Sequence, residues 1–348
     1  MILGRMVFAF ALAVLACAPS WAQAEKRRVI IDTDPGTDDA MAILLALNSP
    51  ELKVEAFTVV PGNVDGKQGL ENALKLLSLA GRCDVPVAGG AQHPLNQKLY
   101  TAMYWHGKNG LADIELPPSN CKADTRFAPD LIIELVHKYP HEITLIPVGP
   151  LTNIALAVSK DPSITKLVKD IVIMGGSISG GNVTGAAEAN IFGDPEAAQI
   201  VFNAGWVVTM VGSDVGERTL LRRKQLSELE SSHGPQNDVV TGIARFCIER
   251  SEKNGWDGAA MYDPLAVSVV IDRTLVTLKD MHVDVETRGE FTRGETVANR
   301  MGVNEKNVLH GDHYEIEGYD VLPVNARVAV SSDAARFLAL FISRVKGK

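Results

Sequence analysis

Four aspartates fall within eight residues near the start of the chain, in the run Asp32-Thr33-Asp34-Pro35-Gly36-Thr37-Asp38-Asp39. So many carboxylates at such short spacing are typical of a cation site or of acid–base catalysis. The β-branched run 29–31 before them predicts a strand, and Pro35-Gly36 predicts the turn that follows it. Because parallel strands present ligands at their carboxyl ends, we expect these carboxylates to converge at one sheet edge. Helix capping would explain Asp38 and Asp39, but it leaves Asp32 and Asp34 unexplained.

The residue types favour calcium over zinc at this position. Carboxylate oxygens are the hard ligands that Ca²⁺ prefers, whereas zinc sites need His or Cys, and neither lies nearby. An EF-hand loop counted from Asp32 would need Gly where Thr37 stands, so that type of site is excluded. A phosphoryl-transferring aspartate motif of the DxDx(T/V) kind is also excluded, because Gly36 occupies its hydroxyl or β-branched position.

Residues 32–40 resemble the N-terminal motif DTDPGxDDA of the inosine-uridine preferring nucleoside hydrolase family, and the match is complete. The resemblance implies an α/β fold with an open, mostly parallel Rossmann-like sheet, helices on both faces and an active site at the strand carboxyl ends. It extends from about residue 28 to the C-terminus. Further segments that resemble the family follow in order: Pro61-Gly62-Asn63-Val64, His106-Gly107-Lys108-Asn109-Gly110-Leu111, Gly149-Pro150-Leu151-Thr152-Asn153, Met174-Gly175-Gly176, residues 182–190 and Tyr262-Asp263-Pro264.

Residues 1–24 are expected to form a cleavable signal peptide that is not part of the fold. Arg5 precedes the uncharged apolar run 6–18, and Ala22-Gln23-Ala24 stands directly before a charged segment. The apolar run is shorter than the roughly 20 residues of a membrane-spanning helix. A lipoprotein at Cys17 is disfavoured, because a bulky Leu15 replaces the usual small residue. We therefore expect cleavage after Ala24, a periplasmic or secreted protein, and no membrane attachment after cleavage.

The remaining residues, 25–348, are expected to form a single nucleoside hydrolase domain. They contain Cys83, Cys121 and Cys247, so at least one thiol stays unpaired. A bond between Cys83 and Cys121 is left open, and no essential disulfide is expected. The full chain has a formal net charge of −8 at pH 7, which argues against a nucleic-acid polymer as the ligand. A small-molecule ligand is expected instead.

Short β-rich runs alternate with helical patterns along these residues, which predicts a largely parallel sheet with helices on both faces. The sequence contains no repeat or linker that would divide the domain. Residues 117–120 and 231–237 are predicted to be surface loops. Strands are predicted at residues 29–33, 54–60, 143–148, 171–174 and 207–211, and helices at residues 38–47, 66–80, 129–138, 151–158 and 195–202.

The resemblance to the family implies a calcium site built from residues that follow these strands. Asp34, Asp39 and Asp263 match the side-chain ligands of the family, and Val148 matches a ligand that acts through its backbone carbonyl. Without the resemblance, Asp263 would be interpreted as an ordinary helix N-cap, because Pro264 and a helical pattern follow it. By resemblance, Ca²⁺ also binds the ribose 2'- and 3'-hydroxyls.

The resemblance also implies the reaction, hydrolysis of the N-glycosidic bond of a ribonucleoside to free base and ribose. Asp34 would take a proton from the water molecule that the calcium ion activates. The remaining matched residues would bind the ribose: Asp38 at the 2'-hydroxyl, Asn63 and Asn190 at the 3'-hydroxyl, and Asn182 and Glu188 at the 5'-hydroxyl.

Activation of the leaving base is the step at which this chain departs from the best-known pattern. Tyr262 stands where the inosine-uridine preferring subgroup has a His that acts as an acid, whereas purine-preferring members have an aromatic residue there. Purine nucleosides are therefore slightly favoured, although stacking, proton donation and plain packing all remain open for Tyr262. His106 matches a family histidine on a mobile loop over the base, or it is an ordinary surface His. The candidates for a second aromatic wall are Tyr104, Trp105 and Trp256.

Three classes of function remain to be compared. A ribonucleoside hydrolase is favoured because both the metal ligands and the proposed base, Asp34, are present. An exported nucleoside-binding protein without catalysis would not need Asp34, and a calcium-stabilised structural protein would not need Asn63 or Asn190. The resemblance further implies a homodimer or homotetramer.

Overall fold

We describe a computed structural model of the chain that covers residues 25–298, 308–309, 312–313 and 322–348. The predicted signal peptide, residues 1–24, lies outside these described residues. None of the described helices combines the length and the apolar character that crossing a membrane requires.

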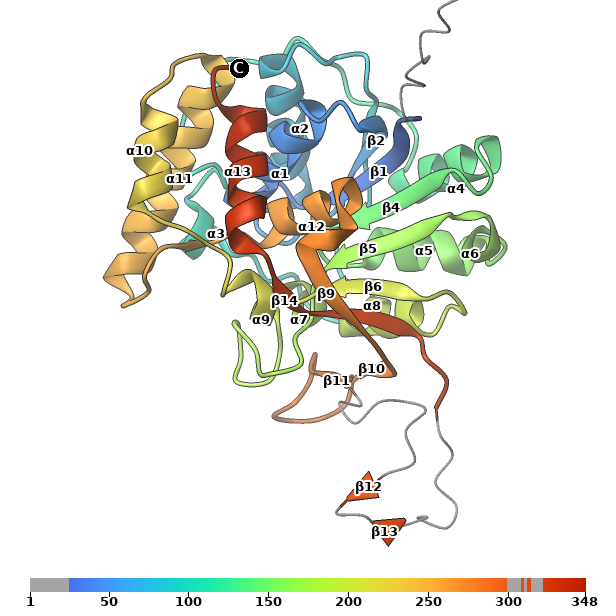
Figure 1. Cartoon of the computed structure of the whole chain (residues 1–348). Coiled ribbons are helices and arrows are strands. Elements are labelled where there is room, and N and C mark those ends of the chain that lie inside the picture. Colours follow the sequence, from blue (N-terminus) through green and yellow to red (C-terminus); the bar gives the residue numbers. More distant parts are fainter. Residues whose placement is uncertain (1–24, 299–307, 310–311, 314–321) are drawn as a thin grey trace, which may run out of the picture.

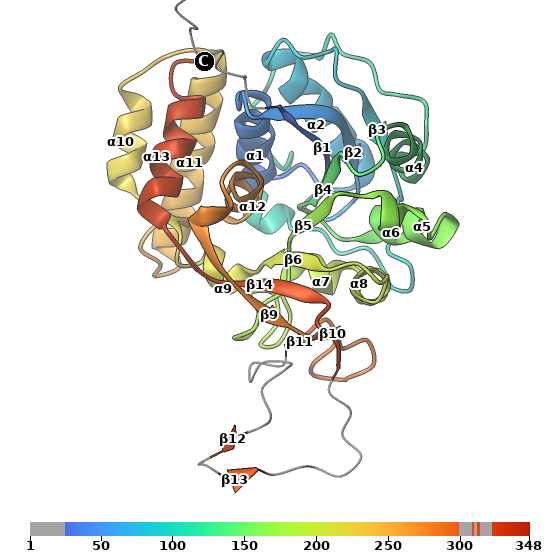
Figure 2. The same cartoon turned by 45° about the vertical axis from the view of Figure 1, so that its right-hand side comes forward.

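A twisted eight-stranded sheet forms the centre of the molecule, and the predicted α/β fold is confirmed (Figures 1 and 2). The strand order is β3-β2-β1-β4-β5-β6-β14-β9, and every neighbouring pair is parallel except β14 with the edge strand β9. The strands are β1 (Arg27–Thr33), β2 (Leu52–Val59), β3 (Val87–Gly89), β4 (Ile143–Pro147), β5 (Asp170–Met174), β6 (Val208–Val211), β9 (Val276–Met281) and β14 (Ala326–Ser332).

Helices cover both faces of the sheet. Successive side chains of a strand point to opposite faces, and both faces carry apolar side chains that the helices bury. In β1, Val29 and Ile31 pack into one hydrophobic core, whereas Ile30 packs into the other. The first core lies under α1 (Thr37–Leu47), α2 (Gly66–Leu79), α11 (Pro235–Lys253), α12 (Tyr262–Ile271) and α13 (Ala334–Val345). The second core lies under α4 (Ala128–Lys138), α5 (Thr152–Lys160) and α8 (Pro195–Phe202).

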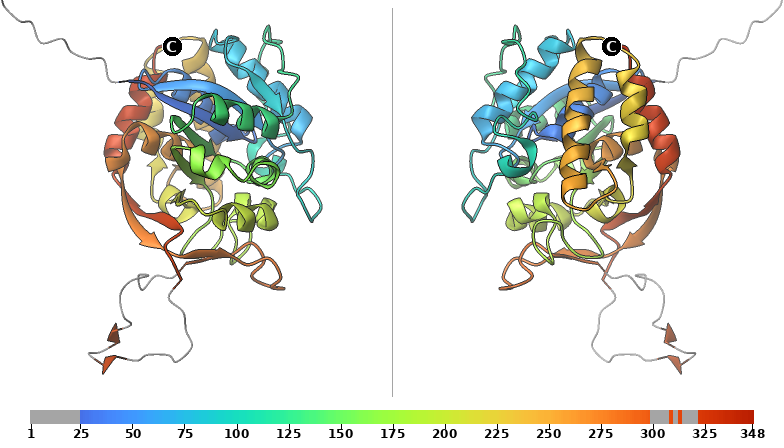
Figure 3. Two further views of the ribbon diagram at one scale, coloured as in Figure 1. Left: turned by 90° about the vertical axis from the view of Figure 1, so that its right-hand side faces the viewer. Right: turned by 90° about the vertical axis from the view of Figure 1, so that its left-hand side faces the viewer.

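Helix α10 (Arg223–Glu230) contacts both α11 and α13, and the three helices form one side of the molecule (Figure 3). The remaining elements are short. They are α3 (Met103–His106), α6 (Ile164–Leu167), α7 (Ala189–Gly193), α9 (Ser213–Gly216), the 3₁₀ helix η1 (Arg273–Leu275) and the antiparallel pairs β7 (Leu220–Leu221) with β8 (Ala259–Ala260), β10 (Val283–Val285) with β11 (Thr296–Ala298), and β12 (Val308–Leu309) with β13 (Asp312–His313).

All five predicted strands and all five predicted helices are present, with ends that differ by a few residues at most. The predicted loop at 117–120 is also present, but the loop predicted at 231–237 is wrong in part, because α11 already begins at Pro235. Proline is favoured in the first helical turn, where its missing N–H costs nothing. The sequence interpretation did not predict strands β3, β9 and β14 or helices α10, α11 and α13.

A disulfide joins Cys83 to Cys121, a pairing that the sequence left open. It links the turn after α2 to the irregular segment that runs from β3 to α4. The same segment is held to α2 by Ser119, whose hydroxyl donates to the Leu74 carbonyl at 2.7 Å. The disulfide therefore ties down one end of the segment that also carries α3.

Loss of this disulfide is expected to lower stability without preventing folding. Closing a loop with a sequence separation of 38 residues stabilises a chain by roughly 2–4 kcal/mol. Cys121 packs only against the outside of the first core and Cys83 is in neither core, so the Cys83→Ser/Cys121→Ser variant should fold and unfold at a lower temperature. The measurement is thermal unfolding with and without reductant. Reductant should destabilise the native chain only, and an equal effect on the variant would contradict this assignment.

Candidate active site

The aspartate-rich motif makes the tight connection between β1 and α1. Asp39 is fully buried, and each of its carboxylate oxygens accepts two hydrogen bonds. Oδ1 accepts from the Thr33 hydroxyl at 2.5 Å and from the Asp34 N–H at 3.1 Å, and Oδ2 accepts from the Gly36 N–H at 3.0 Å. Asp39 thus caps its own helix while it fixes the loop that carries Asp34, so the capping interpretation is confirmed for this residue.

Asp34 lies where three strand ends meet, and two glycines make room for its carboxylate. A Cβ at Gly62, after β2, would lie 2.1 Å from Asp34 Oδ2, and a Cβ at Gly149, after β4, would lie 2.6 Å from Oδ1. The Asn63 N–H donates to Asp34 Oδ2 at 2.8 Å. Oδ1 is buried and has no hydrogen-bond partner among the described residues. Both glycines occur in motifs that resemble the family, but the sequence alone indicated no role for them.

Three carboxylates come together beside this loop, and two of them, Asp38 and Asp263, line a cavity. One oxygen each of Asp38, Asp39 and Asp263 lies within 4.8 Å of the others, although Asp263 is far away in the sequence. Asp263 occupies the first turn of α12, and the cap position is Met261, so Asp263 is not the N-cap of that helix. The predicted ligand set shares Asp39 and Asp263 with this group, which contains Asp38 in place of Asp34.

Burial and mutual repulsion raise the pKa values of these carboxylates. Burial is the largest cause for Asp34 and Asp263, whose pKa values lie well above the usual range, and neighbouring aspartates raise them further. Burial also raises the pKa of Asp38 to about 6. A divalent cation would offset both the cost of burying these charges and the repulsion between them. The oxygen donors, their spacing and the unpartnered Asp34 Oδ1 all fit such an ion, so the cluster can hold a metal.

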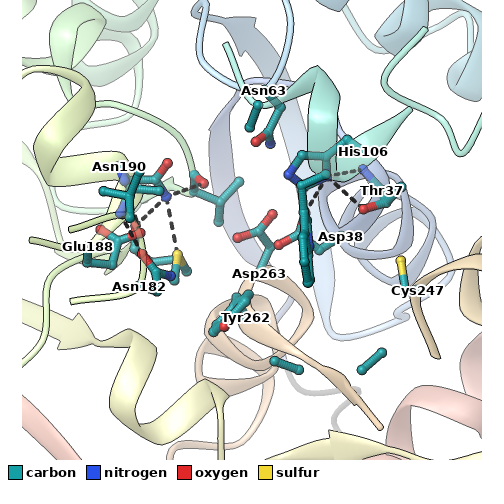
Figure 4. A pocket seen from close by; sticks show the side chains of 18 of the residues that line it. Thr37, Asp38, Asn63, His106, Asn182, Glu188, Asn190, Cys247, Tyr262 and Asp263 are labelled. Carbon is teal, nitrogen blue, oxygen red and sulfur yellow. Dashed lines mark hydrogen bonds and ion pairs between the residues drawn. The ribbon is translucent and has the colours of Figure 1, made fainter. Parts of the chain in front are cut away.

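All the predicted ribose-binding residues, Asp38 and four others, line one cavity of about 240 Å³ together with Asp263 (Figure 4). Asn63 Nδ2 donates to Asp39 Oδ2 at 2.9 Å, and Asn190 Nδ2 donates to the Val148 and Met174 carbonyls at 2.9 and 3.1 Å. Among the described residues neither amide oxygen has a hydrogen-bond donor, so each can accept from a ligand. The four residues are Asn63, Asn182, Glu188 and Asn190.

Glu188 and Asn182 hold the loop after β5 in place. Glu188 is almost completely buried, and its carboxylate accepts from the Gly176, Asn190 and Ile191 N–H groups at 2.8, 2.9 and 3.2 Å. Burial still raises its pKa to about 7. Asn182 Oδ1 accepts from the Ala189 N–H at 3.0 Å, which leaves the amide nitrogen as the donor. The loop therefore presents a carboxylate and an amide to the same end of the cavity (Figure 4).

His106 is a buried residue of the cavity wall, so its interpretation as a surface histidine is wrong. Its Nδ1 accepts from the Thr37 backbone N–H at 3.2 Å and lies 2.7 Å from the Thr37 hydroxyl. A ring nitrogen that accepts a backbone N–H carries no proton, so the proton sits on Nε2. Burial and the Arg250 charge lower the pKa of His106 to about 4, against the opposing effect of Asp39, and the ring stays neutral at pH 7.

Aromatic side chains form the rest of the wall, and Tyr104, Trp105, Trp256 and Tyr262 all line the cavity, as predicted. The Tyr262 ring packs against Gly216, where a Cβ would come within 2.3 Å of a ring carbon. Burial raises the pKa of Tyr262, so its hydroxyl keeps its proton and can donate. The Arg250 guanidinium lies 5.5 Å from the centre of the Trp105 ring and joins α11 to α3 by a cation–π contact.

Helix α11 supplies one wall of the cavity, which the sequence did not predict. Cys247 and Ser251 lie four residues apart on this helix, which places them on the same helix face, and both line the cavity. Burial raises the pKa of the Cys247 thiol to about 12, so it acts as a small apolar group. A helical prediction for residues 235–253 would have paired the two side chains, but only the packing of α11 shows that they face the site.

The chain matches the sequence model of the family described as inosine-uridine preferring nucleoside hydrolase over residues 29–339. It is 43% identical over 265 residues to uridine nucleosidase 1 from Arabidopsis thaliana, covering 75% of this chain and 79% of the relative. A plant nucleoside hydrolase structure superimposes with a TM-score of 0.85 at 37% identity, covering 93% of this chain and 100% of the other. The purine-preferring ribonucleoside hydrolase from Gardnerella vaginalis gives 0.83 at 36% identity, covering 92% and 98%.

Without metal, the chain is expected to lose stability as the pH rises from about 4 to about 8. The folded-state pKa values of Asp38 and Glu188 are about 6 and about 7, against ordinary values of 3.8 and 4.5. Because both pKa values are raised, the contribution to stability is fully present below the ordinary values and is lost as the pH rises through the folded ones. The midpoint of thermal unfolding in a chelator should fall by several degrees over this range.

Added Ca²⁺ should raise that midpoint, and by more at pH 8 than at pH 5, because the ion binds ionised carboxylates. Mg²⁺ at the same concentration serves as the matched control, since it demands tighter octahedral geometry and should stabilise less. A midpoint that stays constant or rises with pH in chelator, or that calcium does not change, would contradict the assignment of the cluster.

Proposed function

Because the chain belongs to the inosine-uridine preferring nucleoside hydrolase family and is a ribonucleoside hydrolase, we propose that it is Ca²⁺-dependent and that Asp34 is its general base. The main support is a single cavity lined by carboxylates of the aspartate cluster, three amides, Glu188 and an aromatic wall. Water attacks the anomeric carbon, the N-glycosidic bond breaks, and the products are ribose and the free base.

The proposed calcium ligands are the carboxylates of Asp34, Asp39 and Asp263 and the Val148 carbonyl, with Asp38 close enough to take part. The Val148 carbonyl already accepts from Asn190, and its second lone pair remains available. A bound Ca²⁺ would ionise the surrounding carboxylates, lower the pKa of a neighbouring water molecule and orient the ribose hydroxyls.

Asp34 suits the role of base because its carboxylate is held in place but not fully used. The Asn63 N–H and the two glycines fix its position, and Oδ1 has no partner among the described residues. A fixed acceptor can take a proton from water without reorganising during the reaction. A binding protein without catalysis, which is the alternative function, would have no need for such a group.

The polar residues of the cavity favour ribose over deoxyribose and free nucleosides over nucleotides. Asp38 Oδ1 is buried and has no partner among the residues that the structure describes, so it is available to a 2'-hydroxyl. A ligand that lacks this hydroxyl leaves the acceptor unsatisfied, at a cost of about 1–3 kcal/mol. Glu188, the proposed partner of the 5'-hydroxyl, would repel a 5'-phosphate.

A slight preference for purine nucleosides completes the proposal. Four aromatic side chains line the cavity, and Tyr262 retains the proton that a departing base can accept. A purine offers a larger surface than a pyrimidine for stacking on such a wall. The relatives differ in their preference, since one is named a uridine nucleosidase and another a purine-preferring hydrolase.

We also propose export and self-association. The apolar run 6–18 and the small residues before Glu25 support a cleaved signal peptide, and N-terminal sequencing of exported protein should begin at Glu25. A homodimer or homotetramer is proposed from the family resemblance alone. Light scattering that gives the mass of one chain would reject it.

Replacing Asp34 by Asn should reduce kcat by about 10²–10⁴-fold, the usual contribution of a positioned base. The change removes the proton acceptor but keeps the shape and the hydrogen bond from the Asn63 N–H. The measurement is release of reducing sugar from inosine at saturating Ca²⁺, with nucleoside binding measured in parallel.

Asp84→Asn is the matched control, because Asp84 is a surface aspartate paired with Arg82. It should leave kcat unchanged. An Asp34→Asn variant that folds and turns over at the native rate would refute the role of Asp34. A native chain that binds nucleosides without releasing sugar would instead support the binding protein.

A further inference from the structure

The Glu188 carboxylate is connected to the central sheet through one backbone N–H group. Glu188 is the N-cap of α7, and two of the N–H groups from which it accepts, those of Asn190 and Ile191, belong to that short helix itself. The third belongs to Gly176, just beyond the end of β5, and donates at 2.8 Å. Gly176 has a φ of +74°, a left-handed conformation that favours glycine. The turn at Gly176 therefore fixes where the carboxylate stands relative to the sheet.

The peptide group that joins Gly176 to Ser177 is held from both sides. Its carbonyl accepts from the Ser213 N–H at 2.8 Å, and its N–H donates to the Thr296 hydroxyl, also at 2.8 Å. The same hydroxyl donates to the Ser177 carbonyl at 2.6 Å. Ser177 is buried, so its backbone groups need partners within the protein. One threonine side chain satisfies both of them and thereby holds the turn.

Thr296 is buried behind this turn and is not among the described residues that line the cavity. A Cβ at Gly176 would lie 2.9 Å from the Thr296 methyl carbon, so the threonine packs directly against the glycine. Thr296 is the first residue of β11, and the turn before it carries Arg293, which pairs with Glu196 of α8 at 2.8 Å. The β10–β11 hairpin is thus fastened to the body of the protein, and it holds Thr296 in place.

We propose that Thr296 is a positioning residue for the 5'-hydroxyl of the substrate. It acts through Ser177 and Gly176, whose N–H holds the Glu188 carboxylate at the end of the cavity. Without the threonine hydroxyl, the N–H and the carbonyl of Ser177 would have to find other partners, and the turn would shift to reach them. The proposal rests on the proposed function, because it requires the 5'-hydroxyl to bind at Glu188.

The test compares inosine with 5'-deoxyinosine, which lacks the 5'-hydroxyl. Both substrates release hypoxanthine, so the leaving base is the same in each. Thr296→Val keeps the shape of the side chain and removes its hydroxyl. We expect the ratio of kcat/KM for inosine to that for 5'-deoxyinosine to fall by about 3- to 10-fold, the effect of one hydrogen bond. Inosine should lose a contact that 5'-deoxyinosine never makes.

Three further variants separate the hydroxyl from packing and folding. Thr296→Ser retains the hydroxyl and should keep the ratio near the native value. Thr144→Val is the matched control, because Thr144 is also buried in the sheet but lies near the start of β4, at the edge opposite the cavity. It should leave the ratio unchanged. If Thr296→Val does not fold, Thr296→Cys takes its place, and its weakly hydrogen-bonding thiol should also lower the ratio.

A double variant tests whether Thr296 acts through Glu188. Thr296→Val and Glu188→Gln should each lower the ratio, and together they should lower it no further than the larger single effect. Substitutions that act on one contact are not additive, whereas independent ones are. A threonine that only supported the fold would lower kcat/KM for both substrates equally and leave the ratio unchanged.

The outcomes distinguish this inference from the function beneath it. An unchanged ratio in Thr296→Val, or an equal fall in Thr296→Ser or Thr144→Val, would refute the role of Thr296 and leave the hydrolase assignment intact. Effects of Thr296→Val and Glu188→Gln that multiply would refute its action through Glu188. Release of hypoxanthine from neither substrate by the calcium-loaded native chain would instead overturn the proposed function itself.

Discussion

The structure depends on bringing several carboxylates together in a buried place where they repel one another. Asp34, Asp39 and Asp263 are each at most 2% exposed, and burial is the largest cause of their raised pKa values. Such a cluster is unfavourable unless hydrogen bonds and a positive charge compensate for lost hydration. The fold supplies the hydrogen bonds, and a divalent cation would supply the charge. The same ion would lower the pKa of a neighbouring water molecule and orient the ribose hydroxyls.

The parallel sheet explains why these residues can meet. The carboxyl ends of β1, β2, β4 and β5 lie side by side, and each is followed by a loop that delivers one part of the site. Gly62 and Gly149 allow two of these loops to touch the Asp34 carboxylate. The first turn of α12 then adds Asp263 and Tyr262, one to the aspartate cluster and one to the aromatic wall. The proposed metal ligand and the proposed base contact are therefore neighbours in sequence.

Local patterns predicted the parts of the site that follow strands, because a β-branched run followed by Pro-Gly or Gly-Asn is a local signal. They could not place Asp263, whose nearness to Asp39 depends on how α12 packs against α1, and only the family resemblance connected the two. Ser251 was missed because α11 itself was not predicted. β14 was missed because its place between β6 and β9 is set by contacts distant in sequence.

In the proposed function, the aspartate cluster makes this chain a calcium-dependent ribonucleoside hydrolase. The most direct measurement is release of reducing sugar from inosine, guanosine, adenosine, uridine, cytidine and 2'-deoxyinosine, with calcium and after chelation. We expect release that stops on chelation and returns with Ca²⁺, and that is greatest for the purine ribonucleosides and weakest for the deoxynucleoside. No release from any of them by a folded, calcium-bound protein, or release that chelation does not change, would contradict it.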